Sequence, residues 1–247
     1  MTAAETRRLR AALEARVLER AAAFRERHAP LTPDRMAAGI GFRWRVAAIA
    51  GRDGLLDAAS GTILVAEGQS PRRQRFTLAH EVMHRLIEED GELLSDLHEA
   101  YEGAALERAL ERLCNLGAAE MLLPRAEVAR ALAASGPNPR LLWELADRFG
   151  VSEPAAAVAV VGALGPGSLA AVFGGRPPAV YFAFGAGAPA RGTVLPENHP
   201  LAAVLTTGLP QRGALELPGG ARAERAWARP WRGRVYLLAT GVEAAGG

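Results

Sequence analysis

One predicted helix, at residues 72–88, strongly limits how this chain can fold. Apolar side chains recur along it at helical spacing and form a broad face that has to be buried. The same segment contains HEVMH at residues 80–84, which brings two imidazoles and a carboxylate into an apolar region. Buried polar groups need partners. The fold must therefore satisfy these side chains, either as hydrogen-bonded core histidines with Glu81 facing solvent or as a functional site.

The spacing within HEVMH is typical of a metal site. Two histidines four residues apart point to the same side of a helix, because four residues make just over one turn, so both can bind one ion. Glu81 cannot bind that ion in this geometry, but it can take a proton from an activated water. A catalytic zinc site needs a third protein ligand. The metzincin pattern does not supply it, because Asp90 stands six residues after His84 where a histidine would be required.

The third ligand must then come from farther along the chain. The side chains that qualify are His98, Glu99, Glu102, Glu107, Glu111 and Glu120. We select Glu111, because it lies in the middle of a predicted helix at about residues 102–121 that can pack against the first helix. Asn115 lies one turn later on the same face. Cys114 is either a small core residue or a fourth ligand that would close the site.

Composition excludes several other chemistries. All 29 basic residues are arginine, so there is no lysine for a Schiff base or a phosphate-binding loop. A single cysteine allows no disulfide framework and no cysteine-rich zinc site. A net charge of +2 does not by itself indicate nucleic acid. The mixed charges of the N-terminus and the short apolar run at residues 155–164 predict a cytoplasmic protein without membrane association.

The pattern along the chain predicts an α+β protein of three parts. Residues 1–126 form a mainly helical domain with a small antiparallel sheet, built from residues 42–50, a hairpin turn at Asp53-Gly54 and residues 62–66. Residues 127–164 form a helical domain. Glycine and proline become dense after residue 165, and residues 167–247 form a small α+β domain. Its expected strands lie near residues 169–173, 180–184, 215–217 and 235–240.

The middle part has helix-turn-helix spacing, with helical residues 141–149, the turn Gly150-Val151-Ser152 and a second helical run to residue 164. Reading DNA bases needs polar or basic side chains, whereas residues 153–164 contain one glutamate and otherwise small or apolar residues. We therefore expect packing, or recognition of a repressor's helices, rather than direct DNA binding. Five arginines with two tryptophans between residues 222 and 234 form a basic cluster that is either solvated or binds an anion or partner.

Two segments together resemble the ImmA/IrrE metallopeptidase family. They are RFTLAHEVMH at residues 75–84 and ERLCNLGAAEMLLP at residues 111–124, beside the family patterns R-F-T-x-A-H-E-x-x-H and E-x-x-A-N-x-F-A-A-E-L-L-x-P. The separation of 27 positions from His84 to Glu111 (111 − 84) is similar to that in its radiation-response branch, and so is the order of peptidase, helix-turn-helix and GAF-like domain. The resemblance covers about residues 3–160. Cys114 and Gly117 depart from it, standing where the family has alanine and phenylalanine.

The resemblance implies a zincin-like peptidase domain and a GAF-like C-terminal sensor domain that takes an unknown small molecule or other signal. It implies a cytoplasmic zinc metalloendopeptidase, able to use Mn²⁺ in vitro, that cleaves a helix-turn-helix (XRE-type) repressor and so derepresses DNA-damage and stress genes. His80, His84 and Glu111 would hold the metal and Glu81 would carry the proton. The alternative is a non-proteolytic regulator that binds DNA or the repressor through the helix-turn-helix region.

Substrate contacts are predicted at two places. The run at residues 62–66 is expected to be a sheet edge with which an extended peptide pairs, which makes Thr62 and Leu64 substrate-binding residues. Tyr101 is the third expected substrate-binding residue. The sequence assigns no oxyanion stabiliser: Tyr101 and His98 are candidates, and the alternative for each is a surface residue.

Overall fold

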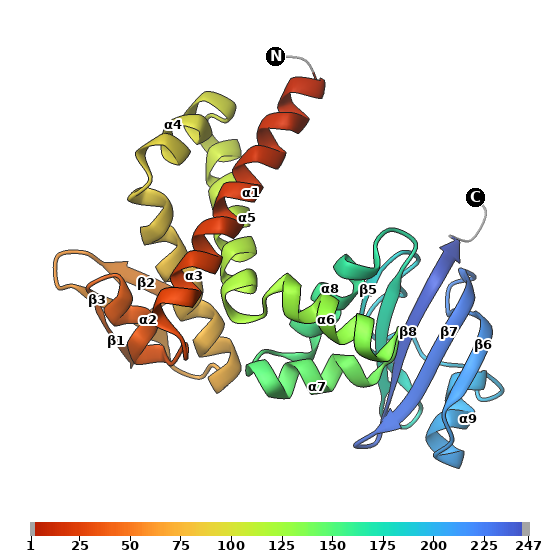
Figure 1. Ribbon diagram of the computed structural model, residues 1–247. Coiled ribbons are helices and arrows are strands. Elements are labelled where there is room, and N and C mark those ends of the chain that lie inside the picture. Colours follow the sequence, from red (N-terminus) through yellow and green to blue (C-terminus); the bar gives the residue numbers. More distant parts are fainter. Residues whose placement is uncertain (1–2, 244–247) are drawn as a thin grey trace. The chain divides into compact units, whose positions relative to one another are not determined.

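The computed structural model describes residues 3–243 and divides the chain into two compact units, residues 1–124 and 125–247 (Figure 1). The first unit contains α1 (Ala3–His28), α2 (Pro33–Gly39), β1 (Arg43–Ala47), β2 (Gly54–Asp57), β3 (Thr62–Ala66), α3 (Pro71–Glu88), α4 (Gly91–Ala100) and α5 (Gly103–Leu122). The second contains α6 (Arg125–Ser135), α7 (Arg140–Phe149), α8 (Glu153–Leu164), β4 (Leu169–Gly174), β5 (Ala179–Gly185), α9 (Pro200–Thr207), β6 (Gln211–Glu216), β7 (Arg222–Trp231) and β8 (Arg234–Glu243). The expected α+β class is confirmed.

The sheet of the first unit has the order β1-β3-β2, with β1 parallel and β2 antiparallel to β3. The expectation of an antiparallel sheet is therefore wrong for one of its two pairings. It fails because the segment between β1 and β2 carries the chain across β3 to its other side. Asp53-Gly54 leads into β2, and the hairpin turn lies instead at residues 58–61, where Gly61 adopts a positive φ of 61°.

Helix α3 begins as its sequence predicts and packs its apolar face inward. Ser70 caps it by accepting a hydrogen bond from the Arg73 N–H, and Pro71 occupies the first turn. Its buried side chains include Leu78, Val82 and Met83, and α3 packs against α5 and β3. A Cβ at Gly117 of α5 would lie 2.4 Å from Met83 Cε, so the glycine allows the two helices to approach closely. The backbones that carry the HEVMH segment and Glu111 are thus packed directly together.

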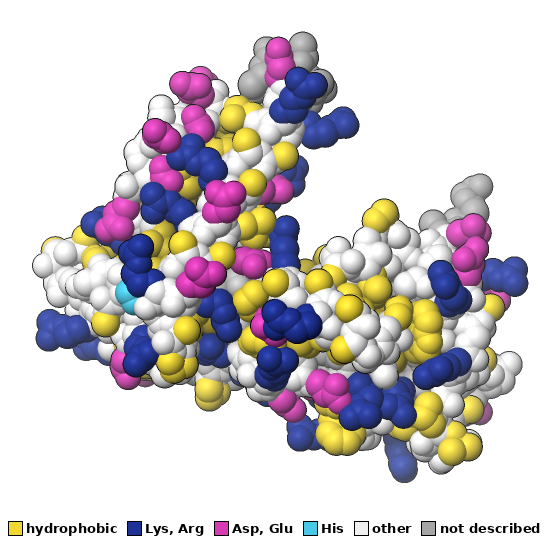
Figure 2. Space-filling view, in the orientation of Figure 1, with side chains coloured by type: hydrophobic (Ala, Val, Ile, Leu, Met, Phe, Trp, Pro, Cys, Tyr) yellow, Lys and Arg dark blue, Asp and Glu magenta, His cyan; other side chains and the backbone are white. Residues whose placement is uncertain are grey.

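A network of charged side chains ties α1 to the start of α4. Asp90 caps α4 by accepting the Leu93 N–H, and its carboxylate also binds Arg16 at 2.9 Å and Arg20 at 2.6 Å. Asp96 accepts a second bond from Arg16 at 3.0 Å. Acidic and basic side chains are interspersed over the visible surface of α1 and α4 (Figure 2). These contacts hold the start of α4 against α1.

The second unit is built on a five-stranded antiparallel sheet of order β5-β4-β8-β7-β6. Alternate residues of β4, including Leu169, Ala171 and Phe173, join Leu201 and Val204 of α9 in one buried cluster. The expected strands near residues 169–173, 180–184 and 235–240 are present, and the run near 215 forms the end of β6. Strand β7 was not predicted; it runs through the arginine-rich segment, with Ala223, Ala226 and Ala228 turned inward.

Helices α7 and α8 pack on each other, and α8 also packs on β4 and β5 of the same unit. Gly150 ends α7 in the left-handed conformation, and Ser152 caps α8 by accepting the Ala155 N–H. Ala156, Ala157, Val160 and Val161 are the buried residues of α8. Much of the apolar surface of α8 is therefore used in packing. Among the described residues, no helix is long and apolar enough to cross a membrane.

Candidate metal centre

Helix α3 brings two imidazoles together at one point on its surface. The Nε2 atoms of His80 and His84 lie 3.1 Å apart, and the rings meet edge to face with centroids 4.8 Å apart. Both rings are largely covered, with side-chain exposures of 14% and 20%. The four-residue spacing predicts that both rings lie on one side of the helix, and the two Nε2 atoms do face the same small volume.

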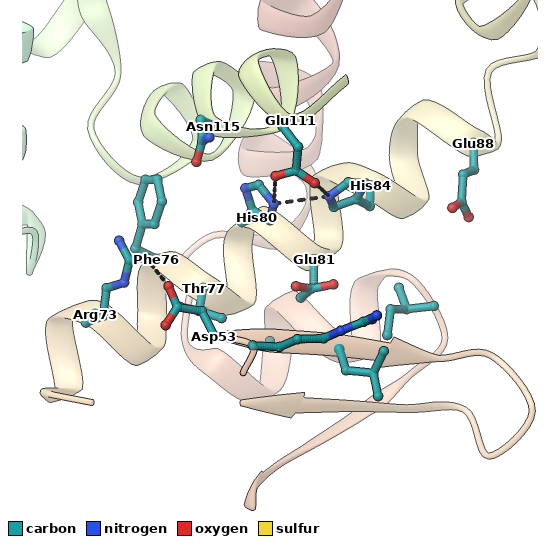
Figure 3. A pocket seen from close by; sticks show the side chains of 14 residues that line it. Asp53, Arg73, Phe76, Thr77, His80, Glu81, His84, Glu88, Glu111 and Asn115 are labelled. Carbon is teal, nitrogen blue, oxygen red and sulfur yellow. Dashed lines mark hydrogen bonds and ion pairs between the residues drawn. The ribbon is translucent and has the colours of Figure 1, made fainter. Parts of the chain in front are cut away.

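Glu111 reaches this volume from α5, as Figure 3 shows. Its Oε2 lies 3.3 Å from His80 Nε2 and its Oε1 lies 3.3 Å from His84 Nε2. One ligand atom from each of the three residues lies within 4.8 Å of the others. Within residues 3–243, the structure does not place the other five residues considered as third ligand in this group; they are His98, Glu99, Glu102, Glu107 and Glu120.

The donor set fits a zinc ion. Zn²⁺ in catalytic sites is commonly bound by two histidines and a glutamate, with a further position left open. Burial, together with the neighbouring His84, lowers the pKa of His80, so its ring nitrogen is kept neutral and able to donate a lone pair. The two nitrogen atoms and the carboxylate converge at distances that a single cation can bridge.

Glu81 lies next to the three ligands but is directed toward β2 (Figure 3). Burial raises the pKa of Glu81 to about 7, the carboxylate of Glu111 adds to the rise, and Arg52 and the Leu56 N–H oppose it. Gly54 of β2 makes the close approach possible, because a Cβ there would lie 2.6 Å from Glu81 Oε1. The carboxyl group of Glu81 therefore lies between α3 and β2, and its pKa allows it to exchange a proton near neutral pH.

His80, Glu81, His84 and Glu111 line a pocket of about 650 Å³. Residues 54–56 of β2 line it, together with Phe76 and Asn115. Arg73 and Asp53 form an ion pair at its edge (Figure 3). His80 Nδ1 is buried without a hydrogen bond of normal geometry to any described atom, and the Asn115 side chain lies on its side of the pocket and favours the protonated imidazole. Asn115 is thus placed to orient the His80 ring.

Residues 42–160 match the family model described as the IrrE N-terminal-like domain of peptidase family M78. This chain carries an IrrE N-terminal-like domain. All four site residues fall within it. The chain is 40% identical over 175 residues to the radiation response metalloprotease IrrE of Deinococcus deserti. The match covers 64% of this chain and 62% of the relative.

The protein of the same name from Deinococcus radiodurans is 37% identical over 190 residues, covering 68% of this chain and 58% of the relative. The chain therefore spans about three fifths of the length of these curated relatives. A solved structure described as a Mycobacterium tuberculosis transcriptional regulator superposes with a TM-score of 0.51 at 15% identity, over 94% of this chain and 76% of that one. This last likeness concerns the fold alone.

Within the IrrE N-terminal-like domain, the residues expected to bind substrate lie outside the pocket lining. Thr62 and Leu64 belong to β3, which is the central strand of its sheet, so the expectation that this strand is an edge is wrong. Tyr101 follows the last residue of α4 and does not line the pocket either. The edge strand that borders the site is β2. Sequence reasoning missed it because its four residues carry no alternating pattern.

The two departures from the ImmA/IrrE pattern are both accommodated in the helix pair of this domain. Cys114 is fully buried, and burial, with Glu111 as a further cause, raises the pKa of its thiol. Among described residues, the ligand group contains His80, His84 and Glu111 without it. Gly117 provides the space that Met83 occupies. Cys114 therefore has the environment of a core residue.

Proposed function

We propose that this protein is a zinc-dependent metalloendopeptidase. The observation that carries the proposal is the convergence of His80, His84 and Glu111 on one point with Glu81 beside it. The names of the two Deinococcus relatives support it. When bound, Zn²⁺ supplies Lewis-acid chemistry that activates water and polarises the scissile carbonyl.

Residues of the chain transfer the proton, bind the peptide and position a metal ligand. Glu81 accepts the proton from the attacking water and passes it to the leaving amine, and a pKa of about 7 suits a group that must do both. The backbone of β2 borders the pocket at a sheet edge, so an extended peptide can pair with residues 54–56 and present its scissile bond to the site. Asn115 lines the same pocket as His80 and orients its ring when the metal is bound.

We further propose that the substrate is a helix-turn-helix (XRE-type) transcriptional repressor whose cleavage derepresses DNA-damage and stress genes. The motif resemblance to the ImmA/IrrE family and the radiation-response names of the relatives support this assignment. A repressor substrate also places the reaction in the cytoplasm. The apolar composition of α8 and its packing on β4 and β5 favour recognition of the repressor protein over direct DNA reading.

The test is cleavage of candidate repressors by the purified full chain with Zn²⁺ or Mn²⁺. Wild type is expected to cut one repressor at a specific bond, Glu81→Gln is expected to lose this activity while retaining the metal, and Glu99→Gln is the matched control. Glu99 lies on exposed α4 surface away from the pocket lining. Intact repressor under both metals, with repressor or DNA binding retained, would refute the peptidase and support the regulator that acts without proteolysis.

A further inference from the structure

A second pocket, of about 340 Å³, lies in the C-terminal unit at the outer strand of the five-stranded sheet. Its walls come from the ends of β4 and β8, from β5 and from the loop that follows β5. The side chains that face it include Tyr181, Arg191 and Arg234. Tyr181 is 44% exposed, so its ring is accessible from the pocket.

Both arginines are arranged around the ring of Tyr181. The guanidinium carbon of Arg234 lies 4.2 Å from the ring centroid, and that of Arg191 lies 5.8 Å from it. Cation–π contact of this kind orients a guanidinium while leaving its N–H groups free to bind other partners. The ring thus holds two sets of hydrogen-bond donors at one small site.

The backbone is built to place these side chains. Arg234 is paired with Gly174 across β8 and β4, and a Cβ at Gly174 would lie 3.2 Å from Arg234 Cγ, so the glycine leaves a path across β4 toward Tyr181. The loop that carries Arg191 is fixed to β5 by two hydrogen bonds of 2.9 Å. The Gly192 N–H donates to the Val180 carbonyl, and the Val180 N–H donates to the Thr193 carbonyl. Both arginines therefore stand on ordered backbone.

The charges at this pocket are not balanced. Arg234 lies 3.6 Å from Glu153 Oε2, and that same oxygen accepts a 2.9 Å hydrogen bond from the Tyr236 hydroxyl. Arg191 has no carboxylate within ion-pair distance in the part of the chain that the structure describes. Only one of the two guanidinium groups therefore has a carboxylate partner, and that carboxylate also binds Tyr236, which leaves an excess positive charge beside the aromatic ring.

We propose that this pocket binds the phosphoryl group of a small molecule through Arg191 and Arg234, with Tyr181 as the apolar surface for whatever the phosphoryl group is attached to. Arginine matches phosphate oxygens with parallel N–H donors, and a phosphate carries up to two negative charges, so it can engage both side chains at once. A single carboxylate would compensate less of the charge. The site is separate from the metal centre and does not depend on peptidase activity.

The experiment is calorimetric titration of the full chain with inorganic phosphate and with phenyl phosphate. Wild type is expected to bind one equivalent, and Arg191→Gln and Arg234→Gln are each expected to weaken binding by about tenfold or more, because a charge-assisted bond is removed. Arg176→Gln is the matched control, since Arg176 follows Gly175 in the β4–β5 turn but does not line the pocket. Arg191 is exposed, so its variant is expected to fold normally.

Glu153→Gln provides a change of opposite sign. It removes the competing charge near Arg234 while glutamine can still accept the Tyr236 hydroxyl, so phosphate binding is expected to strengthen severalfold. Tighter binding of phenyl phosphate than of inorganic phosphate would identify an ester as the ligand, and equal binding would identify free phosphate. Absence of saturable binding to both, or an equal loss in Arg176→Gln and Arg191→Gln, would overturn the proposal.

Discussion

Substituting Gly54 by alanine tests whether the backbone of β2 positions the proton-transfer group. The added Cβ would lie 2.6 Å from both Glu81 Oε1 and Thr77 Cγ2, and 3.1 Å from Glu81 Cδ. An ordinary contact is about 3.6 Å, so the Glu81 carboxylate has to retreat by about 1 Å. A displacement of this size at a reacting group costs about 100-fold in rate, equivalent to about 2.7 kcal/mol of transition-state stabilisation.

The assay for Gly54→Ala is the single-turnover rate of repressor cleavage, with metal content and thermal unfolding measured on the same preparation. The metal ligands are not among the atoms that the new Cβ would meet, so zinc is expected to stay at about one equivalent, while overpacking lowers the free energy of unfolding by about 1–3 kcal/mol. Gly91→Ala is the matched control, because nothing lies within 4 Å of a Cβ there. Cleavage at the wild-type rate by a normally folded Gly54→Ala protein would refute the idea that β2 holds Glu81.

Three further predictions follow from the contacts described above. Asn115→Ala is expected to weaken zinc affinity about 10- to 100-fold by releasing the His80 ring, and competition with a chromogenic chelator measures this; unchanged affinity would contradict it. Burial opposes ionisation of Asp90, but its hydrogen bonds and arginine partners lower its pKa below the ordinary 3.8, so its stabilising contribution is present above that value and is lost as pH falls through the lowered pKa. The difference in melting temperature between wild type and Asp90→Asn should therefore shrink from about pH 6 to about pH 3, and a constant difference would argue against the ion pairs. Tyr236→Phe removes the bond to Glu153 and should cost about 1–3 kcal/mol in denaturant unfolding, whereas a neutral result would show that the buried hydroxyl contributes nothing.

Local sequence was sufficient where short-range geometry decides the outcome. Ser70 and Pro71 mark the start of α3, and the four-residue spacing of His80 and His84 places both rings on one side of it, because helix geometry depends only on neighbouring residues. Glu111 was selected from six alternatives by helix length and position, and the packing of α5 on α3 brings it to the two histidines.

Local sequence does not predict which strand forms the edge of the first sheet, nor that β7 belongs to the second sheet. Strand β2 is four residues long without alternation, and β7 turns alanines inward where a strand usually shows branched or aromatic residues. The order β1-β3-β2 depends on how a connecting segment crosses β3, which no local pattern records. For this reason Thr62 and Leu64 were assigned to an edge that is in fact central.

The sequence by itself determined the chemistry that this protein can offer, since absent lysine and a single cysteine leave histidine, carboxylate and metal as its means, and helical spacing already joins two ligands and a proton acceptor. Tertiary structure decided what surrounds them. It set the approach of Gly54 to Glu81, the presence of Asn115 in the same pocket as His80 and the meeting of Arg191 with Arg234 at Tyr181. These contacts join residues far apart in the chain, and their geometry depends on packing between elements rather than on the preference of any one segment.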